Sequence, residues 1–87
     1  MYDRPELSTG YDRPKTATER KIAAIWENLF VIDKIGRNDN FYEIGGHSLL
    51  ATILASELQK KFGKSISIRN IMDFPTIAEL ALLIQNK

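Results

Sequence analysis

The sequence contains no cysteine, and its only histidine is His47. Without cysteine the chain has no disulfide bond and no thiolate ligand for a metal ion. One histidine leaves no plausible zinc-binding set of side chains. Disulfide scaffolds and cysteine-based metal sites are therefore excluded, and the chain has no thiol of its own.

A strong excess of either charge is also missing. Twelve lysines and arginines face 11 aspartates and glutamates, so the formal net charge is +1. Nucleic-acid-binding domains usually carry a clear basic excess on one face. Lys60, Lys61, Lys64 and Arg69 do cluster, but they lie at the far end of a predicted helix, where cations stabilise the negative end of the helix dipole. A phosphate-binding patch is the alternative at this cluster, but we expect no nucleic-acid partner.

Long apolar runs are absent as well. No stretch approaches the roughly 20 residues that span a bilayer, and the charged N-terminus is not typical of a signal peptide. We expect a soluble, cytoplasmic domain without a membrane partner. A chain of 87 residues has room for one core and too little surrounding chain for an enclosed catalytic cleft. Carriers, binding modules and regulators remain.

What the sequence does contain is helical periodicity. Residues 1–15 hold two of the three prolines and no such periodicity, so we interpret them as an interdomain linker and residues 16–87 as the folded domain. We expect an all-α fold, a small bundle of three main helices with a short fourth helix and a long first loop. The predicted helices are Ala17 to about Val31, Ser48 to about Phe62, Ile68 to Met72, and a last helix that begins after Thr76.

The ends and buried faces of these helices are visible in the sequence. Thr16 with Glu19, and Thr76 with Glu79, have the spacing of capping boxes, and Gly63 stands where a helix commonly ends. Apolar side chains at helical spacing predict the buried faces. These are Ile22, Ile25, Trp26, Leu29 and Phe30 in the first helix, Leu50, Ile53, Leu54, Leu58 and Phe62 in the second, and Ile77, Leu80, Ala81 and Ile84 in the last.

The segment NFYEIGGHSLL, residues 40–50, places Ser48 at the start of a predicted helix behind two glycines. Ser48 as an N-cap is one interpretation. A catalytic nucleophile elbow is a second, but it fails because Leu50 stands where that motif needs glycine. Attachment of a phosphate-bearing group is the third, since a helix N-terminus favours an anion and Gly45 and Gly46 would let a modifying enzyme approach. Spacing alone does not separate the cap from the attachment point.

The segment DNFYEIGGHSLLA, residues 39–51, resembles the core motif of the peptidyl carrier (thiolation) domains of nonribosomal peptide synthetases. Residues 19–30 resemble the first helix of that family, and residues 74–84 resemble its last helix. Residues 4–14 are similar to the linker that follows an adenylation domain. Tyr42 stands where phenylalanine is commoner, and we expect no functional consequence.

This resemblance implies an acyl-carrier-protein-like fold and a definite function. Ser48 would receive 4′-phosphopantetheine from coenzyme A through a phosphopantetheinyl transferase. The thiol of that arm would carry aminoacyl or peptidyl thioesters between adenylation, condensation and thioesterase domains, while the domain itself catalyses nothing and is a monomer when excised.

Two alternatives to a peptidyl carrier domain remain. The nearest is an acyl carrier protein of fatty-acid or polyketide synthesis, but such proteins are typically strongly acidic, and the charge of +1 argues against it. A small helical interaction or DNA-binding module that uses Ser48 only as a cap is a remote alternative.

Four residues are candidate contacts for partner domains. Leu49 lies off the predicted buried stripe of its helix, so we expect it to be exposed. His47 precedes the serine in the loop. Met72 and Phe74 flank the short helix and either fill the core or contact partners, and a flexible methionine suits a surface that meets several partners.

Overall fold

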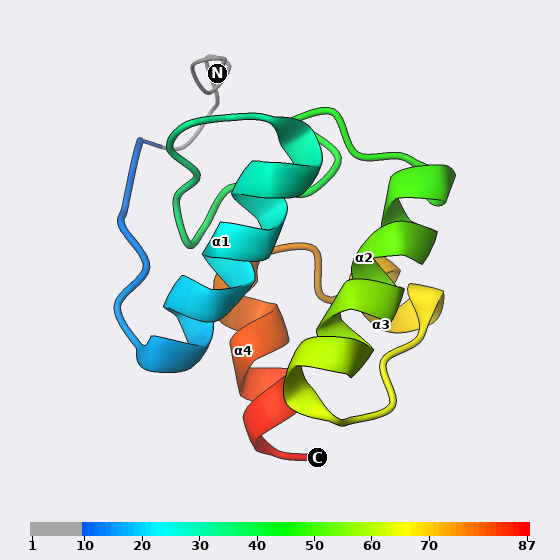
Figure 1. Cartoon of the computed structure of the whole chain (residues 1–87). Helices are drawn as coiled ribbons and strands as arrows, with labels where there is room; N and C mark the ends of the chain where they lie inside the picture. Colours follow the sequence, from blue (N-terminus) through cyan, green and yellow to red (C-terminus); the bar gives the residue numbers. More distant parts are fainter. Residues whose placement is uncertain (1–9) are drawn as a thin grey trace.

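The computed structural model describes residues 10–87 and contains four helices in this part of the chain (Figure 1). None of them is long and apolar enough to cross a membrane. The predicted all-α bundle is confirmed, with three longer helices and one short helix. The helices are α1 (Ala17–Phe30), α2 (Ser48–Phe62), α3 (Ile68–Asp73) and α4 (Ile77–Gln85).

The core lies between α1, α2 and α4, with α3 packed against α2. Trp26 is fully buried, as expected, and meets the rings of Phe30 and Phe41 edge to face. Ile53 was predicted to be buried but is 39% exposed. Successive residues of a helix point about 100° apart, and α2 turns Leu54 and Leu58 inward, which leaves Ile53 at the edge of the buried face.

The helix ends follow local chemistry. The predicted cap Thr16 accepts a hydrogen bond from the N–H of Glu19 at 3.0 Å, and Thr76 accepts one from Glu79 at 3.2 Å. Gly63 ends α2 in the left-handed conformation, with φ of 65°. The helix α1 stops one residue earlier than predicted, because Val31 adopts the left-handed conformation with φ of 54°.

Residues 31–47 connect α1 to α2 and are held against the bundle rather than lying free. Phe41 and Ile44 are buried. The N–H of Phe41 donates to the carbonyl of Pro75 at 2.7 Å, and the N–H of Ala78 donates to the carbonyl of Arg37 at 3.0 Å. This long loop is therefore bound to the start of α4, and its last residues lead directly into α2 at Ser48.

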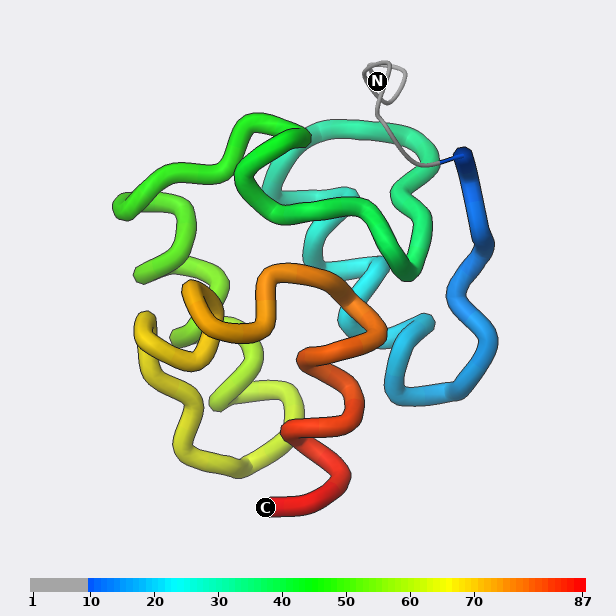
Figure 2. Tube along the Cα trace, turned by 180° about the vertical axis from the view of Figure 1, so that it is seen from behind, coloured from blue at the N-terminus to red at the C-terminus, as the bar shows by residue number. Residues whose placement is uncertain are grey.

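Residues 10–15 form no helix and lie beside α1 and the long loop (Figure 2). The carbonyl of Asp12 accepts a hydrogen bond from the N–H of Arg37 at 2.7 Å. The interpretation of residues 1–15 as an interdomain linker stays a prediction, and residues 1–9 lie outside the described part of the chain.

Candidate cofactor-attachment site at the start of α2

Ser48 is the first residue of α2 and is exposed. His47 is the N-cap: its backbone is extended, with φ of −150° and ψ of 178°, and its carbonyl accepts a hydrogen bond from the N–H of Ala51 at 2.8 Å. The interpretation of Ser48 as the N-cap is therefore wrong. The cap residue is the one that keeps a non-helical backbone, and that residue is His47, whose side chain makes no capping hydrogen bond.

The hydroxyl of Ser48 makes no hydrogen bond to any residue of the described range 10–87, whereas the Ser48 carbonyl accepts one from Oγ1 of Thr52 at 3.0 Å. The serine thus presents an exposed oxygen that the fold does not use. Its place in the first turn of α2 favours a negative charge there, because the N–H groups of that turn lack intrahelical partners. An exposed serine in this position fits the phosphodiester through which a phosphopantetheine arm is attached.

The two glycines before His47 are required for different structural reasons. Gly45 has φ of 113°, a conformation that residues with a side chain rarely adopt. A Cβ on Gly46 would overlap with the ring and the carbonyl of Phe41, and the N–H of Gly46 donates to that carbonyl at 2.9 Å. The paired glycines therefore shape the turn into α2. Access for a modifying enzyme, the reason that the sequence suggested, is not needed to explain Gly46.

The four predicted contact residues differ in exposure. Leu49 is 64% exposed and Met72 is 57% exposed, and His47 is exposed as well. Phe74 is half-buried and packs against the core, so its structural role as core filling is confirmed. The predicted exposure of Leu49 is also confirmed. Their contacts with partners stay a prediction.

Two further apolar residues, on α2 and α3, are exposed although the sequence did not indicate it. Ile53 of α2 is 39% exposed and Ile68 of α3 is 41% exposed. Ile68 is the first residue of α3, whose start is fixed by a complete capping box between Ser67 and Asn70. The sequence signal for this helix start is the asparagine at the third helical position, because its side chain accepts the return hydrogen bond in the way a glutamate does.

Titrating groups with shifted pKa values lie on α1 and the first part of the long loop. The guanidinium of Arg37 donates two hydrogen bonds to the carboxylate of Glu19, at 2.7 and 2.8 Å, and lowers the pKa of Glu19 while the pKa of Arg37 rises. Burial raises the pKa of Glu27. Within residues 10–87 no group of three or more histidine, aspartate or glutamate side chains is arranged to hold a metal ion.

The fold and the exposed serine define a helical domain of the carrier type, and comparison with known proteins gives its family. The sequence model for the phosphopantetheine attachment site matches residues 20–84. The chain belongs to this family, whose cofactor is covalently bound 4′-phosphopantetheine. Within it, the chain is a peptidyl carrier domain of the nonribosomal peptide synthetase type.

Three similar proteins illustrate this assignment. Malpinin synthetase of Mortierella alpina is 45% identical over 71 residues, which are 82% of this chain and 1% of that protein. A peptidyl carrier protein solved with the phosphopantetheine transferase Sfp and coenzyme A is 34% identical, with a TM-score of 0.85 over 88% of this chain and 100% of that one. The Pax synthetase docking-domain complex gives 37% identity and a TM-score of 0.86, over 99% and 82% of the two chains. The chain thus spans only a small fraction of the synthetase that it matches.

Proposed function

We propose that Ser48 bears the 4′-phosphopantetheine arm and that this domain carries aminoacyl or peptidyl thioesters within a nonribosomal peptide synthetase. The observation that carries the proposal is the exposed Ser48 hydroxyl, which has no hydrogen bond to residues 10–87 and stands in the first turn of α2. The family match over residues 20–84 includes this position.

In the attachment reaction this chain supplies only the Ser48 hydroxyl. The Ser48 oxygen would form a bond to the phosphorus that carries the pantetheine arm in coenzyme A, the bond from that phosphorus to the nucleotide phosphate would break, and the hydroxyl proton would leave to a base of the transferase. The arm, once attached, supplies a thiol that holds acyl groups as thioesters. Because the chain has no cysteine, acyl groups have no competing protein thiol on this domain.

The role of the chain in the proposed reaction sequence is presentation rather than catalysis. Its partners are a phosphopantetheinyl transferase and the adenylation, condensation and thioesterase domains of the synthetase. A solved complex of a similar carrier with the transferase Sfp and coenzyme A supports the first of these partners. A cytoplasmic location and a monomeric state of the excised domain stay predictions.

Leu49 and Met72 are the residues that we propose as partner contacts, with His47 beside them. Leu49 follows the serine on α2, and Met72 lies on α3, which packs against α2. Both side chains are more than half exposed. A partner that covers these apolar side chains removes them from water, and this burial favours association. Phe74 contributes by supporting α3 from the core side.

Intact-mass measurement tests the attachment site. Incubation with coenzyme A and a broad-specificity transferase should add the mass of one phosphopantetheine, and fragment mapping should place it on Ser48. Ser48→Ala should abolish the gain and leave the helical circular-dichroism spectrum unchanged. Ser56→Ala, an exposed serine on the same helix, is the matched control and should still be modified. Modification that persists in Ser48→Ala would refute the assignment.

A further inference from the structure

Residues 10–15, here called the strap, are docked on the side of the molecule opposite α2. In Figure 1 the strap descends along the left edge while α2 lies at the right, and the reversed view in Figure 2 keeps the two apart. The strap therefore touches the domain away from the helix that begins at Ser48. Its contacts are with the long loop and with α1.

The middle of the strap is held by the long loop. The Asp12 carbonyl accepts the N–H of Arg37 at 2.7 Å, and the Asp12 carboxylate accepts the side-chain amide of Asn38 at 3.2 Å. The ammonium group of Lys34 lies 4.5 Å from the centre of the Tyr11 ring, within the range of a cation–π contact. Backbone, side-chain amide and aromatic contacts thus all fix the same few residues.

Gly36 makes this close approach possible. A Cβ at this position would lie 3.1 Å from both the nitrogen and the carbonyl oxygen of Asp12, and 3.3 Å from Cδ1 of Tyr11. These distances are tighter than ordinary van der Waals contacts, so the strap would have to move away from a side chain there. The loop carries a glycine where the backbone of the strap passes.

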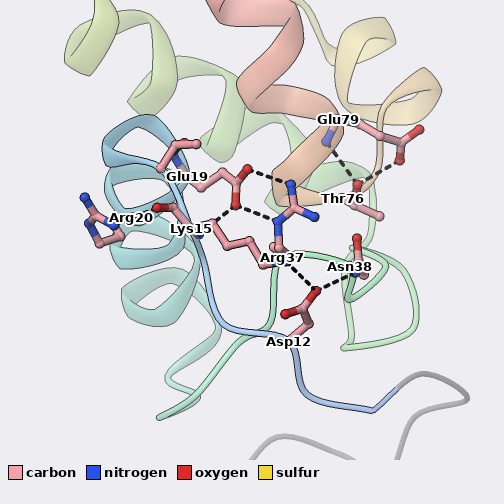
Figure 3. Close-up of polar contacts among 9 residues, drawn as sticks. Asp12, Lys15, Glu19, Arg20, Arg37, Asn38, Thr76 and Glu79 are labelled. Atoms are coloured by element: carbon pink, nitrogen blue, oxygen red, sulfur yellow. Dashed lines mark hydrogen bonds and ion pairs between the residues drawn. The ribbon is translucent and has the colours of Figure 1, made fainter.

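The last residue of the strap joins a buried ion pair. The N–H of Lys15 donates to Oε1 of Glu19 at 2.9 Å, and this carboxylate also receives both hydrogen bonds of Arg37 (Figure 3). The Arg37 carbonyl in turn accepts the N–H of Ala78 at the start of α4. Arg37 therefore connects the strap to α1 and α4.

These contacts suit a segment that docks and releases. No side chain of residues 10–15 is buried, so release of the strap would expose little apolar surface to water. A typical hydrogen bond changes an equilibrium by roughly fivefold, and exposed charge pairs contribute less. A few such contacts favour the docked state without making it permanent.

We propose that the strap is a reversible extension of the carrier domain that sets where its tether begins. When the strap is docked, a tether to a preceding domain starts at Gly10 on the side opposite α2. Release moves that start to Thr16 and adds six residues of chain, roughly 20 Å of reach at about 3.3 to 3.6 Å per residue. The inference rests on the proposed function, because only a domain that travels between partners needs an adjustable tether.

Amide hydrogen exchange measured by NMR on the full chain tests the docking. The N–H of Arg37 should be protected in the unaltered protein, but less than the N–H of Trp26 in α1. Gly36→Ala should raise the Arg37 exchange rate at least tenfold and leave Trp26 unchanged, since Gly36 has an ordinary φ that alanine accepts. Gly10→Ala is the matched control, because a Cβ there meets nothing within 4 Å.

Three outcomes would overturn the proposal. Arg37 exchanging at the rate of an unprotected amide would mean that the strap does not dock. Protection equal to that of Trp26 would make the strap a permanent part of the fold, and an unchanged rate in Gly36→Ala would mean that the strap does not provide the protection.

A distance measurement provides an independent test. The chain has no cysteine, so spin labels can be placed on Gly10→Cys and Ser56→Cys alone. We expect a docked and a longer population in this protein, and mainly the longer one when Gly36→Ala is added. Identical distance distributions would refute the strap. Neither experiment involves coenzyme A, so the strap and the attachment of the cofactor to Ser48 can fail separately.

Discussion

The start of α2 exposes its side chains to solvent, whereas the region around Arg37 buries a charged side chain and satisfies it with hydrogen bonds. At the start of α2, the Ser48 hydroxyl has no hydrogen bond to residues 10–87, and Leu49 is 64% exposed. Around Arg37, the Glu19 side chain is 4% exposed, and its carboxylate receives hydrogen bonds from Arg37 and Lys15. The first region leaves its side chains available, and the second uses them inside the fold.

This contrast separates residues by what their loss should damage. A side chain with no internal contact contributes little to folding, so its replacement should affect recognition or attachment alone. A buried carboxylate with a bound guanidinium is costly to leave unpaired, so its loss should affect stability first. The following substitutions test this separation, beginning with the largest expected change in stability.

Leu54→Ala and Leu49→Ala compare a buried and an exposed leucine on the same helix. Leu54 is fully buried, so its truncation should lower the free energy of unfolding by about 2 to 5 kcal/mol. Leu49→Ala should lower it by less than about 0.5 kcal/mol and slow at least one reaction with the transferase, adenylation or condensation domain. Chemical denaturation measures the first effect and loading assays the second. Equal losses of stability would contradict the assigned faces of α2.

Much of this fold follows from periodicity and caps. The spacing of apolar residues placed α1, α2 and α4, because a buried stripe must repeat with the helix turn. The short helix α3 has too few residues to show such a stripe. The start of α2 at Ser48 was predicted correctly, but the cap was assigned to Ser48 instead of His47, because serine is a common cap and histidine is not. The extended backbone of His47 decides the cap, and residue type does not report it. The end of α1 was missed for a similar reason, since valine rarely adopts the left-handed conformation found at Val31.

The ion pair of Glu19 and Arg37 could not be read from the sequence. The two residues are 18 positions apart, and one of them lies in a loop where no periodicity applies. Glu19 did carry a signal, as the expected partner of Thr16 in a capping box. Only half of that box forms, because the Glu19 carboxylate binds Arg37 and the N–H of Lys15. A long-range partner replaced the local one.

Arg37→Met should give the second-largest loss of stability. It leaves the buried Glu19 carboxylate without its guanidinium, and we expect a loss of about 2 kcal/mol, below the range for fully buried pairs because Arg37 itself is 25% exposed. Modification of Ser48 should proceed as before. Denaturation of the single and double variants with Glu19→Met measures the coupling, which should make the double variant less destabilised than the sum of the two.

A control for this experiment is available on α3. Arg69 pairs with Asp73 at 3.4 Å, with side chains 82% and 53% exposed. Exposed pairs of this kind contribute about 0 to 1 kcal/mol, so Arg69→Met should change stability much less than Arg37→Met. Similar losses in the two variants would mean that burial does not distinguish the Arg37 contact.

The smallest effect that we predict is a change in the pH dependence of stability. The hydrogen bonds from Arg37 are the main cause that holds the pKa of Glu19 below its usual value of 4.5 in the folded protein. A group whose pKa is lower when folded stabilises the fold above its unfolded pKa, and this stabilisation is lost as the pH falls through the folded value. Glu27 acts in the opposite direction, because burial raises its pKa.

Glu19→Gln removes the contribution of Glu19 to this pH dependence. Denaturation measured from pH 6 downward should therefore show a flatter decline of stability below about pH 4.5 in Glu19→Gln than in the unaltered protein. Glu57→Gln, whose side chain is half exposed, gives the effect of removing one exposed carboxylate. An equally steep decline in Glu19→Gln would show that the Arg37 contact does not control the acid sensitivity of this domain.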